Sequence, residues 1–447
     1  MLSADKNAYL TAVGPGTPMG DLLRCYWIPL LYSHELPQAG DPPRRIRLLG
    51  ESLVAFRDTH GRVGLLDHRC PHRGASLFYG RNEDGGLRCA YHGWHFDIDG
   101  RCLETPNEPE DSTLPAKVHT QAYPCREEAG IIWTYMGQPS ESGGLPPLPA
   151  MGWAETTVER RTVLTYTRRC NWVQAMEGDF DSSHLGFLHR SLGSPQTVTR
   201  GDPLRPLLIE DQRPTLEVED TPIGAMCAAV RGGDGQDLYW RVSQFQLPFY
   251  TSVPAYNGLK RLKIWVPMDD THTKVWEANW TLDRDLDAEE RHGRKKRVPP
   301  SGMLPDTGDW YGSGNFAACE ENDYLIDRDR QAKHNFSGLE DETPIQDAAM
   351  QESMGPIVDR SREHLSASDA GIIRMRRRLM RAAEALASDG EMPPGVEQPG
   401  LYRSHGEQAL AGPGEDWKSA YAASIASFYA NAMPVQSQTL QIQGGGG

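Results

Sequence analysis

The chain has 447 residues, of which 46 are Lys or Arg and 61 are Asp or Glu, and its net charge is −15. This length suffices for two or three domains with their own cores, and the acidic balance repels nucleic acid and anionic lipid, so neither is expected as a partner. The start, MLSADKNAYL, lacks the basic flank and apolar core of a signal peptide, and no run of about 18 apolar residues predicts a membrane span.

Eight cysteines are scattered along the chain. Without a signal peptide, they are expected to be the reduced thiols of a cytoplasmic protein. Cys70 and Cys89 alternate with histidines, which favours metal binding for this pair. The other six are expected to be buried apolar thiols; they are Cys25, Cys102, Cys125, Cys170, Cys227 and Cys319.

The first predicted elements are strands. Residues 44–66 read RRIRLLG, SLVAFRD and VGLL, with a THGR turn before the last piece. Alternation of apolar and polar residues, β-branched residues and Gly-bearing turns predict antiparallel hairpins here. Two more strand-like pieces, KVHTQAYPC (117–125) and GIIWTYMG (130–137), complete a predicted small β domain.

Between these strands lies CPHRGASLFYGRNEDGGLRCAYHGW, residues 70–94, with Cys70 and His72 one residue apart and Cys89 and His92 two residues apart. Two thiolates and two neutral imidazoles can hold zinc or a two-iron cluster. Zinc sites usually take pairs with two or more spacer residues. A CxH pair matched by a CxxH pair better fits a [2Fe-2S] centre, in which each loop gives one Cys and one His.

The spacing C-x-H-x16-C-x2-H resembles that of Rieske domains, and the neighbouring letters CPHRG and HGW agree with it. In such a centre, replacing two thiolates by imidazoles raises the potential to roughly −150 to +300 mV. His68 and His95 fall outside the spacing, so we expect them to be polar side chains on a loop or at a strand end.

The rest of the chain predicts a second domain. SESGGLPPLP (140–149) is the expected linker. Beyond it, TVERRTVLTYTRRC, PTLEVED, AMCAAVR, DLYWRVSQFQL and KVWEANWTL predict strands, and residues 171–190 and 366–387 predict helices. Residues 285–335 are expected to form a surface loop, and the four final glycines a tail.

A second constellation lies in NWVQAMEGDFDSSHLGFLH, residues 171–189, which contains D-x2-H-x4-H. Asp181 and His184 are neighbours on one helix face. His184 and His189 can meet at one ion only if the helix bends, widens or ends between them, and Gly186 offers such a point. Taken alone, the pattern is equally typical of a polar helix face, but two imidazoles and a carboxylate also form the facial triad of non-haem Fe(II) oxygenases.

Together, the two motifs resemble the oxygenase component of Rieske non-haem iron ring-hydroxylating oxygenases. GPGTPMGDLLRCYWIP, NDYLIDRDRQ and QESMGPIVDRSREHL further resemble the phthalate-dioxygenase-like branch. The resemblance implies an α+β fold: an N-terminal all-β Rieske [2Fe-2S] domain and a helix-grip (START-like) catalytic domain with an antiparallel sheet. The expected divisions are an N-terminal segment (1–22), the Rieske domain (23–140), the mononuclear-iron domain (150–390) and a C-terminal extension and tail (391–447).

The resemblance also implies a third iron ligand, a carboxylate well downstream of His184 and His189. Asp341, Asp347 and Glu352 are the candidates in the plausible window. We expect Asp347, because it begins the more helix-like part of IQDAAMQESMG and resembles the late Asp position of the family. Spacing alone does not decide between the three.

Asp181 is expected to orient His184 without binding iron. The resemblance implies that it also meets the Rieske histidine His92 of a neighbouring subunit, and hence a trimer or stacked trimers. Members of the branch use O2 and electrons that a separate flavin/iron–sulfur reductase draws from NADH. The chain has no convincing GxGxxG motif of its own, in agreement with such a partner.

Branch members act on aromatic carboxylates, which an arginine can clamp. Arg231 and Arg241 lie on strand-like segments and are candidates, although each is more typical of a surface arginine. The main alternative is an O-demethylating or ether-cleaving aryl-ether monooxygenase, which would share every metal residue. A Rieske electron carrier without oxygenase activity would leave the second motif without a role, and a non-enzymatic sensor of aromatic ligands would need no iron triad.

Overall fold

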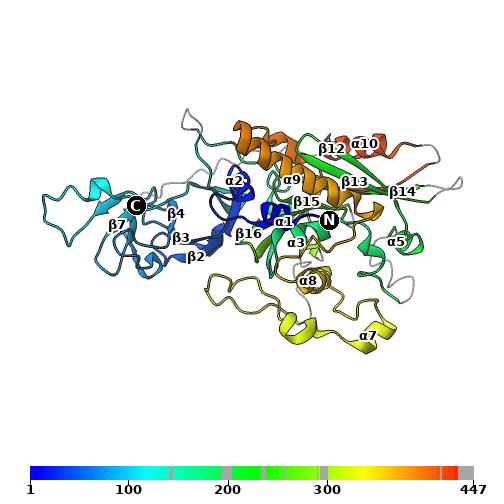
Figure 1. Ribbon diagram of the computed structural model, residues 1–447, viewed down its shortest axis with the longest axis horizontal. Coiled ribbons are helices and arrows are strands. Elements are labelled where there is room, and N and C mark those ends of the chain that lie inside the picture. Colours follow the sequence, from blue (N-terminus) through cyan, green and yellow to red (C-terminus); the bar gives the residue numbers. More distant parts are fainter. Residues whose placement is uncertain are drawn as a thin grey trace, which may run out of the picture.

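The computed structural model of the protein describes residues 1–139, 144–192, 204–232, 238–255, 258–288, 290–291, 301–412 and 415–430. An N-terminal part built mainly of strands lies beside a larger part that holds a long sheet and most of the helices (Figure 1). The predicted α+β fold class is therefore confirmed. The first four residues of the predicted linker, residues 292–300 of the predicted loop and the glycine tail lie outside the described residues.

Three small antiparallel sheets make up the N-terminal part, in the orders β1-β10-β9, β2-β3-β4 and β5-β6-β7-β8. Their strands are β1 (Trp27–Tyr32), β2 (Arg44–Leu48), β3 (Glu51–Arg57), β4 (Val63–Asp67), β5 (Arg81–Glu83), β6 (Gly86–Arg88), β7 (His95–Asp97), β8 (Cys102–Glu104), β9 (Cys125–Glu128) and β10 (Ile131–Tyr135). The strands predicted over 44–66 are confirmed as β2, β3 and β4. The prediction of a strand over 117–125 is wrong, because β9 begins only at Cys125. Pro124 has no backbone N–H to donate to a neighbouring strand.

The larger part is built on one antiparallel sheet, which has eight strands within the described residues, in the order β11-β17-β16-β15-β14-β13-β12, with β18 also paired to β14. The strands are β11 (Arg161–Arg168), β12 (Thr215–Thr221), β13 (Gly224–Arg231), β14 (Leu238–Gln246), β15 (Tyr250–Ser252), β16 (Lys260–Pro267), β17 (Thr273–Trp280) and β18 (Glu407–Ala411). The sequence did not predict β18. It adds a strand to this sheet from beyond residue 390.

Helices pack on this sheet and around its ends. They are α1 (Ala4–Thr11), α2 (Pro18–Arg24), α3 (Trp172–Phe180), α5 (Arg205–Glu210), α7 (Arg328–Lys333), α8 (Thr343–Ser353), α9 (Ala370–Asp389) and α10 (Trp417–Ala430). The long helix α9 lies across β12 and β13 and also contacts α2 (Figure 1). It buries Met375, Leu379 and Ala383, which recur at helical spacing, and it ends at Gly390 with φ 65°. None of the described helices is both long and apolar enough to cross a membrane.

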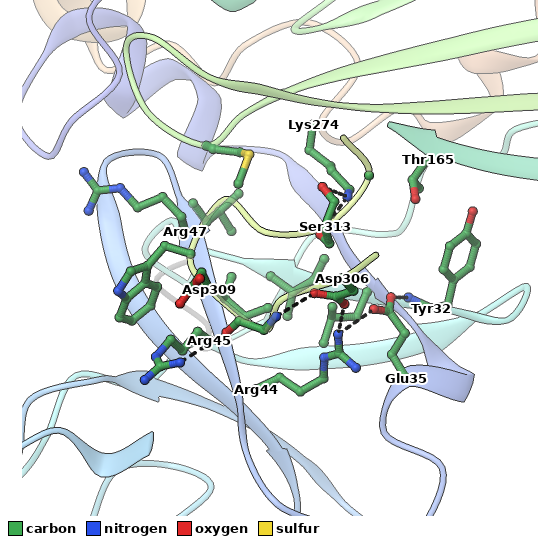
Figure 2. Close-up of a pocket in the computed structure, with 18 of the residues that line it drawn as sticks. Tyr32, Glu35, Arg44, Arg45, Arg47, Thr165, Lys274, Asp306, Asp309 and Ser313 are labelled. Atoms are coloured by element: carbon green, nitrogen blue, oxygen red, sulfur yellow. Dashed lines mark hydrogen bonds and ion pairs between the residues drawn. The ribbon is translucent and has the colours of Figure 1, made fainter. Parts of the chain in front are cut away.

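A shared apolar core joins the two parts. Tyr32 of β1 and Trp276 of β17 have ring centroids 5.0 Å apart within it. Beside this core, a cavity of about 960 Å³ lies between β1, β2 and the large sheet. Asp306, Asp309 and Ser313 line one side of it (Figure 2). Arg44 pairs with Asp306 at 2.8 Å, and Lys274 donates to the Ser313 hydroxyl at 3.0 Å. Apolar packing and charged contacts together fix the N-terminal sheets on the larger part.

Candidate metal centres

The two loops that carry Cys70 and Cys89 have the same backbone hydrogen bonds. In each loop the cysteine N–H donates to the carbonyl of the residue five positions later, at 2.8 Å. Gly74 N–H and Gly93 N–H donate back to the cysteine carbonyls at 2.8 and 2.9 Å. The φ angles of these glycines, 77° and 78°, lie in the left-handed region that favours glycine. Two matched turns therefore present one cysteine and one histidine each.

The four side chains of these turns face one another. Cys70 and Cys89 are each 2% exposed, and the centroids of the His72 and His92 rings lie 4.4 Å apart. Burial is the main cause that raises the pKa of Cys70, to about 12. A backbone hydrogen bond at His72 acts to lower this pKa, and the nearby Cys89 thiol acts to raise it. His72 Nδ1 is buried without a hydrogen-bond partner in the described structure, and a metal ion would satisfy it. Two thiols and two imidazoles in this arrangement fit a [2Fe-2S] cluster.

The neighbouring histidines lie in other settings. His95 is 1% exposed in β7, with its Nε2 3.1 Å from the Glu83 carbonyl oxygen, and His68 Nδ1 lies 3.4 Å from the Ser76 hydroxyl. Of the remaining cysteines, burial is correctly predicted for three. It is wrong for Cys25, Cys125 and Cys319, which are partly exposed.

Residues 171–190 do not form one helix, contrary to the sequence-based prediction. Helix α3 ends at Phe180, and the next residue, Asp181, is extended with φ −68° and ψ 128°. A short 3₁₀ helix, η5 (His184–Gly186), follows. The chain therefore turns at Asp181, before the break expected at Gly186.

The Asp181 carboxylate holds this turn together. Its Oδ1 accepts the Ser183 N–H at 2.7 Å, and its Oδ2 accepts the His184 N–H at 3.2 Å. The same Oδ2 lies 3.1 Å from His184 Nδ1. Aspartate caps turns readily in this way because its side chain competes with the helical hydrogen bonds. The carboxylate thus fixes both the backbone and the ring of His184.

The turn brings both histidines of the second motif to Asp347 on α8. The Nε2 atoms of His184 and His189 lie 3.2 Å apart. Asp347 Oδ1 lies 3.2 Å from His189 Nε2 and 3.8 Å from His184 Nε2. All three candidate ligand atoms fall within 4.8 Å of one another, an arrangement that could hold a metal ion.

The hydrogen bonds of the two imidazoles favour a cation at this point. An ionised carboxylate can only accept hydrogen bonds, so His184 Nδ1 donates its proton to the Asp181 carboxylate. His189 Nδ1 likewise faces an acceptor, the amide oxygen Oε1 of Gln346, at 2.7 Å. Both Nε2 atoms are then left unprotonated, and both lie within 3.8 Å of Asp347 Oδ1. Three electron-rich atoms in contact repel one another unless a cation lies between them. The donor set, two imidazoles and one carboxylate, suits non-haem Fe(II).

The pKa shifts agree with a site prepared for a cation. Burial alone would raise the pKa of Asp347, but the histidines and Lys263 hold it far below its usual range. Burial lowers the pKa of His189, so its imidazole is neutral and able to bind metal. Burial also acts to lower the pKa of His184. The hydrogen bond and the negative charge of Asp181 outweigh this effect, so the pKa of His184 is raised.

The two rival carboxylates have other partners. Asp341 accepts from the Asn335 side-chain amide at 2.8 Å. Glu352 accepts from the Tyr324 hydroxyl at 2.8 Å. Of the three candidates, only Asp347 belongs to the described group of possible metal ligands.

A pocket opens beside this triad, and its lining is rich in charge. Four basic side chains and two acidic ones line it: Arg205, Arg241, Arg261, Lys263, Asp179 and Asp347. Arg241 is 6% exposed and donates to the hydroxyls of Ser182 and Ser243 at 3.1 Å. The sequence predicted one of these cations, Arg241. The other three carry no motif and are brought here by α5 and β16.

Arg231 lies outside this pocket. Its Nε donates to the Asp211 carbonyl at 2.9 Å, and the side chain is 3% exposed. The view that both candidate arginines are typical surface residues is therefore wrong, because both are buried on strands of the large sheet. Only Arg241 faces the triad pocket.

Two protein-family models match this chain. The family model described as Rieske [2Fe-2S] domain matches residues 26–124, and the model described as LigXa C-terminal domain like matches residues 134–440. The 3-chlorobenzoate-3,4-dioxygenase oxygenase subunit of Comamonas testosteroni is 40% identical over 93% of this chain and 96% of its own length. The phthalate 4,5-dioxygenase oxygenase subunit of Pseudomonas putida is 36% identical over 94% of each.

A further relative is the 5,5'-dehydrodivanillate O-demethylase oxygenase subunit of Sphingobium sp., 31% identical over 89% of this chain and 84% of its own length. Among solved structures, the terminal oxygenase of carbazole 1,9a-dioxygenase from Nocardioides aromaticivorans IC177 shares the fold. It has a TM-score of 0.52 and 18% identity over 84% of this chain and 98% of that one. Structures of a carbazole 1,9a-dioxygenase oxygenase in complex with ferredoxin also share it.

Proposed function

Because this chain belongs to the family of Rieske non-haem iron oxygenases, we propose that it is the terminal oxygenase of a two-component system and hydroxylates an aromatic carboxylate. The observation that carries the choice of substrate is the pocket beside the triad. Its basic side chains outnumber its acidic ones, and one of them, Arg241, has a fork of donors suited to a carboxylate. Two relatives named for benzoate- and phthalate-type substrates support the same class.

The roles of the metal-binding residues follow from their chemistry. Cys70, His72, Cys89 and His92 hold the [2Fe-2S] cluster, and His184, His189 and Asp347 hold Fe(II). The cluster supplies single electrons, and the mononuclear iron supplies the binding and reductive activation of O2. Asp181 and the pocket cations do not bind iron. Asp181 orients His184, and Arg241 orients the acid so that its ring faces the triad.

Electrons reach the site from outside the chain. We propose a separate flavin/iron–sulfur reductase that uses NADH, and the oxygenase–ferredoxin complexes with the same fold support a separate electron donor. The loops beside β4 and β7 lie at one end of the molecule, whereas α3 and α8 lie beyond the shared core (Figure 1). This separation favours transfer between subunits of a trimer or stacked trimers, from His92 of the partner subunit to Asp181.

O-demethylation of an aryl ether is the second candidate function. It needs the same metal residues, and the relative named as an O-demethylase supports it. A methoxylated aromatic acid would also satisfy the cationic pocket. The two reactions differ in product: ring dihydroxylation adds both oxygens of O2 to ring carbons, whereas O-demethylation leaves the ether oxygen on the ring as a phenol and releases formaldehyde.

The test is a substrate screen with the full-length protein, a reductase of the phthalate-dioxygenase type and NADH. Benzoates, phthalates and methoxybenzoates are compared with their neutral amides for stimulation of NADH and O2 consumption, with products identified by mass spectrometry. We expect acids to stimulate turnover and amides to fail. Equal turnover of acids and amides would contradict the carboxylate proposal, and formaldehyde release would select O-demethylation.

A further inference from the structure

Gln346 contacts the outer nitrogen of one candidate iron ligand. It lies on α8 directly before Asp347, it is 0% exposed, and its Oε1 lies 2.7 Å from His189 Nδ1. One short helix therefore carries both a candidate ligand and the group that holds another ligand. No motif in the sequence marks this glutamine.

The two histidines are held by different kinds of acceptor. His184 Nδ1 faces the Asp181 carboxylate, whereas His189 Nδ1 faces the neutral amide of Gln346. The amide Nε2 of Gln346 is buried without a hydrogen-bond partner in the described structure. A buried amide that uses only its oxygen is unusual, and such groups in native proteins often have a functional reason. Here the oxygen satisfies His189.

The consequence concerns the proton of the His189 ring. A neutral imidazole carries one proton, on Nδ1 or on Nε2. With an acceptor at Nδ1, the proton stays there and the Nε2 lone pair is free. Without that acceptor, the proton can move to Nε2 and be donated to Asp347 Oδ1, 3.2 Å away. Two of the three candidate ligands would then bond to each other and compete with the metal.

We propose that Gln346 is a positioning residue that holds His189 in the tautomer able to bind iron. This inference rests on the proposed iron triad and adds a residue to it. The amide orientation and metal binding are coupled: rotating the amide by half a turn would present its NH2 group to Nδ1 and force the proton onto Nε2. Because the amide is neutral, it fixes the tautomer without the extra negative charge that Asp181 brings to His184.

The test measures metal binding by four variants and the wild type. Iron-depleted mononuclear sites are titrated anaerobically with Fe(II) and with Co(II) against a chelator, while the visible spectrum monitors the Rieske cluster. Gln346→Leu removes the acceptor at similar size, and Gln346→Glu keeps an oxygen in place. Gln351→Leu is the matched control, because Gln351 is also a buried glutamine of α8 but bonds to Arg168 and Ala175. His189→Ala is the reference for loss of a ligand.

We expect Gln346→Leu to bind both metals about 10- to 100-fold more weakly with an unchanged cluster spectrum. Gln346→Glu should restore binding, and Gln351→Leu should bind within about twofold of wild type. Wild-type affinity of Gln346→Leu, failure of Gln346→Glu to restore binding, or an equal loss in Gln351→Leu would each overturn the inference. Wild-type binding by His189→Ala would instead overturn the triad itself.

Discussion

Asp347 Oδ1 lies 3.2 Å from His189 Nε2, although one residue is on α8 and the other is in the loop that follows α3. The contact joins two segments that are far apart in sequence. The His189 side chain is 4% exposed and that of Asp347 is 12% exposed, and a direct pairing of a neutral imidazole nitrogen with a carboxylate gains little in such a setting. A metal ion shared by the two side chains would explain why the fold brings them together.

We predict that His184→Ala, His189→Ala and Asp347→Ala each remove the mononuclear iron and the oxygenase activity. Loss of one of three protein ligands leaves a position that water cannot hold as tightly. Iron and labile sulfide per chain, measured with the visible spectrum, should show an intact Rieske cluster. Asp341→Ala is the control and should keep its iron. An active, iron-replete Asp347→Ala protein would return the carboxylate role to Asp341 or Glu352.

The cluster can be removed separately. We predict that Cys89→Ser abolishes the EPR signal of the reduced cluster and leaves mononuclear iron largely bound, because the two sites share no ligand. The control is Cys102→Ser, whose sulfur is buried nearby but donates to the Glu104 carbonyl. Stoichiometric zinc without labile sulfide in the wild-type protein would contradict the cluster assignment.

A buried histidine outside the two metal-binding motifs predicts acid lability. His405 is 0% exposed and packs against Trp280, Phe428 and Tyr429. Burial, followed by the charge of Lys260, lowers the pKa of His405 to about 3 from 6.5. Between these values the unfolded chain binds a proton that the folded chain does not. Stability from this group is therefore complete above pH 6.5 and is lost as the pH falls toward 3.

Replacing His405 by Phe removes this titration. We expect the variant to lose less stability between pH 6.5 and pH 4 than the wild type, by up to about 1.4 kcal/mol per pH unit. Thermal unfolding midpoints across this range measure the difference, with His60→Phe as an exposed-histidine control. Parallel wild-type and variant curves would show that His405 does not titrate in this way.

The strands of the large sheet were largely predictable, since PTLEVED, AMCAAVR and DLYWRVSQFQL correspond to β12, β13 and β14. Alternation and β-branched residues carry that signal. Helix α3 was predicted too long, because the side chain of Asp181 replaces helical hydrogen bonds, a local competition that composition does not reveal. Strand β18 was missed because its pairing with β14 depends on the folded sheet.

In the candidate site, too, local sequence patterns predict some features, whereas others depend on tertiary contacts. The spacing of Cys70, His72, Cys89 and His92 is local, so the sequence could predict that these residues meet. Asp347 was one of three candidates. It lies on α8, which packs against α3, whereas Asp341 precedes this helix and pairs with Asn335. Gln346 and the cations of β16 have no motif. Tertiary contacts alone bring them to the triad and its pocket.

Arg241 should control recognition of the acid. We predict that Arg241→Met raises KM for carboxylate substrates by about 10- to 100-fold, a loss on the order of 1.4–2.7 kcal/mol, with iron content unchanged. Arg241→Lys should keep part of the affinity, since lysine retains the charge but not the fork. Arg231→Met is the matched control, because Arg231 is buried outside the pocket. Equal KM values for Arg241→Met and wild type would remove Arg241 from the substrate site.

Asp181 is the proposed bridge between the two metal centres. It is partly exposed, with 20% of its side chain accessible, so His92 of the partner subunit can approach it. In Asp181→Asn the single amide oxygen can take the place of Oδ2, which faces both the backbone N–H and the Nδ1 of His184, so we expect the fold and both metals to be retained. The amide lacks the negative charge and the second acceptor oxygen that would join the two imidazoles. We predict that electron passage from cluster to iron slows on the order of 100-fold.

The measurement is a single turnover: the cluster is reduced chemically, substrate and O2 are added, and reoxidation is followed by absorbance. Asp220→Asn serves as the control, since Asp220 pairs with Arg374 on the surface. Light scattering gives the oligomeric state of each variant, because a bridge between subunits works only in a closed ring. Reoxidation of Asp181→Asn at the wild-type rate, or full activity of an isolated monomer, would show that electrons follow another route.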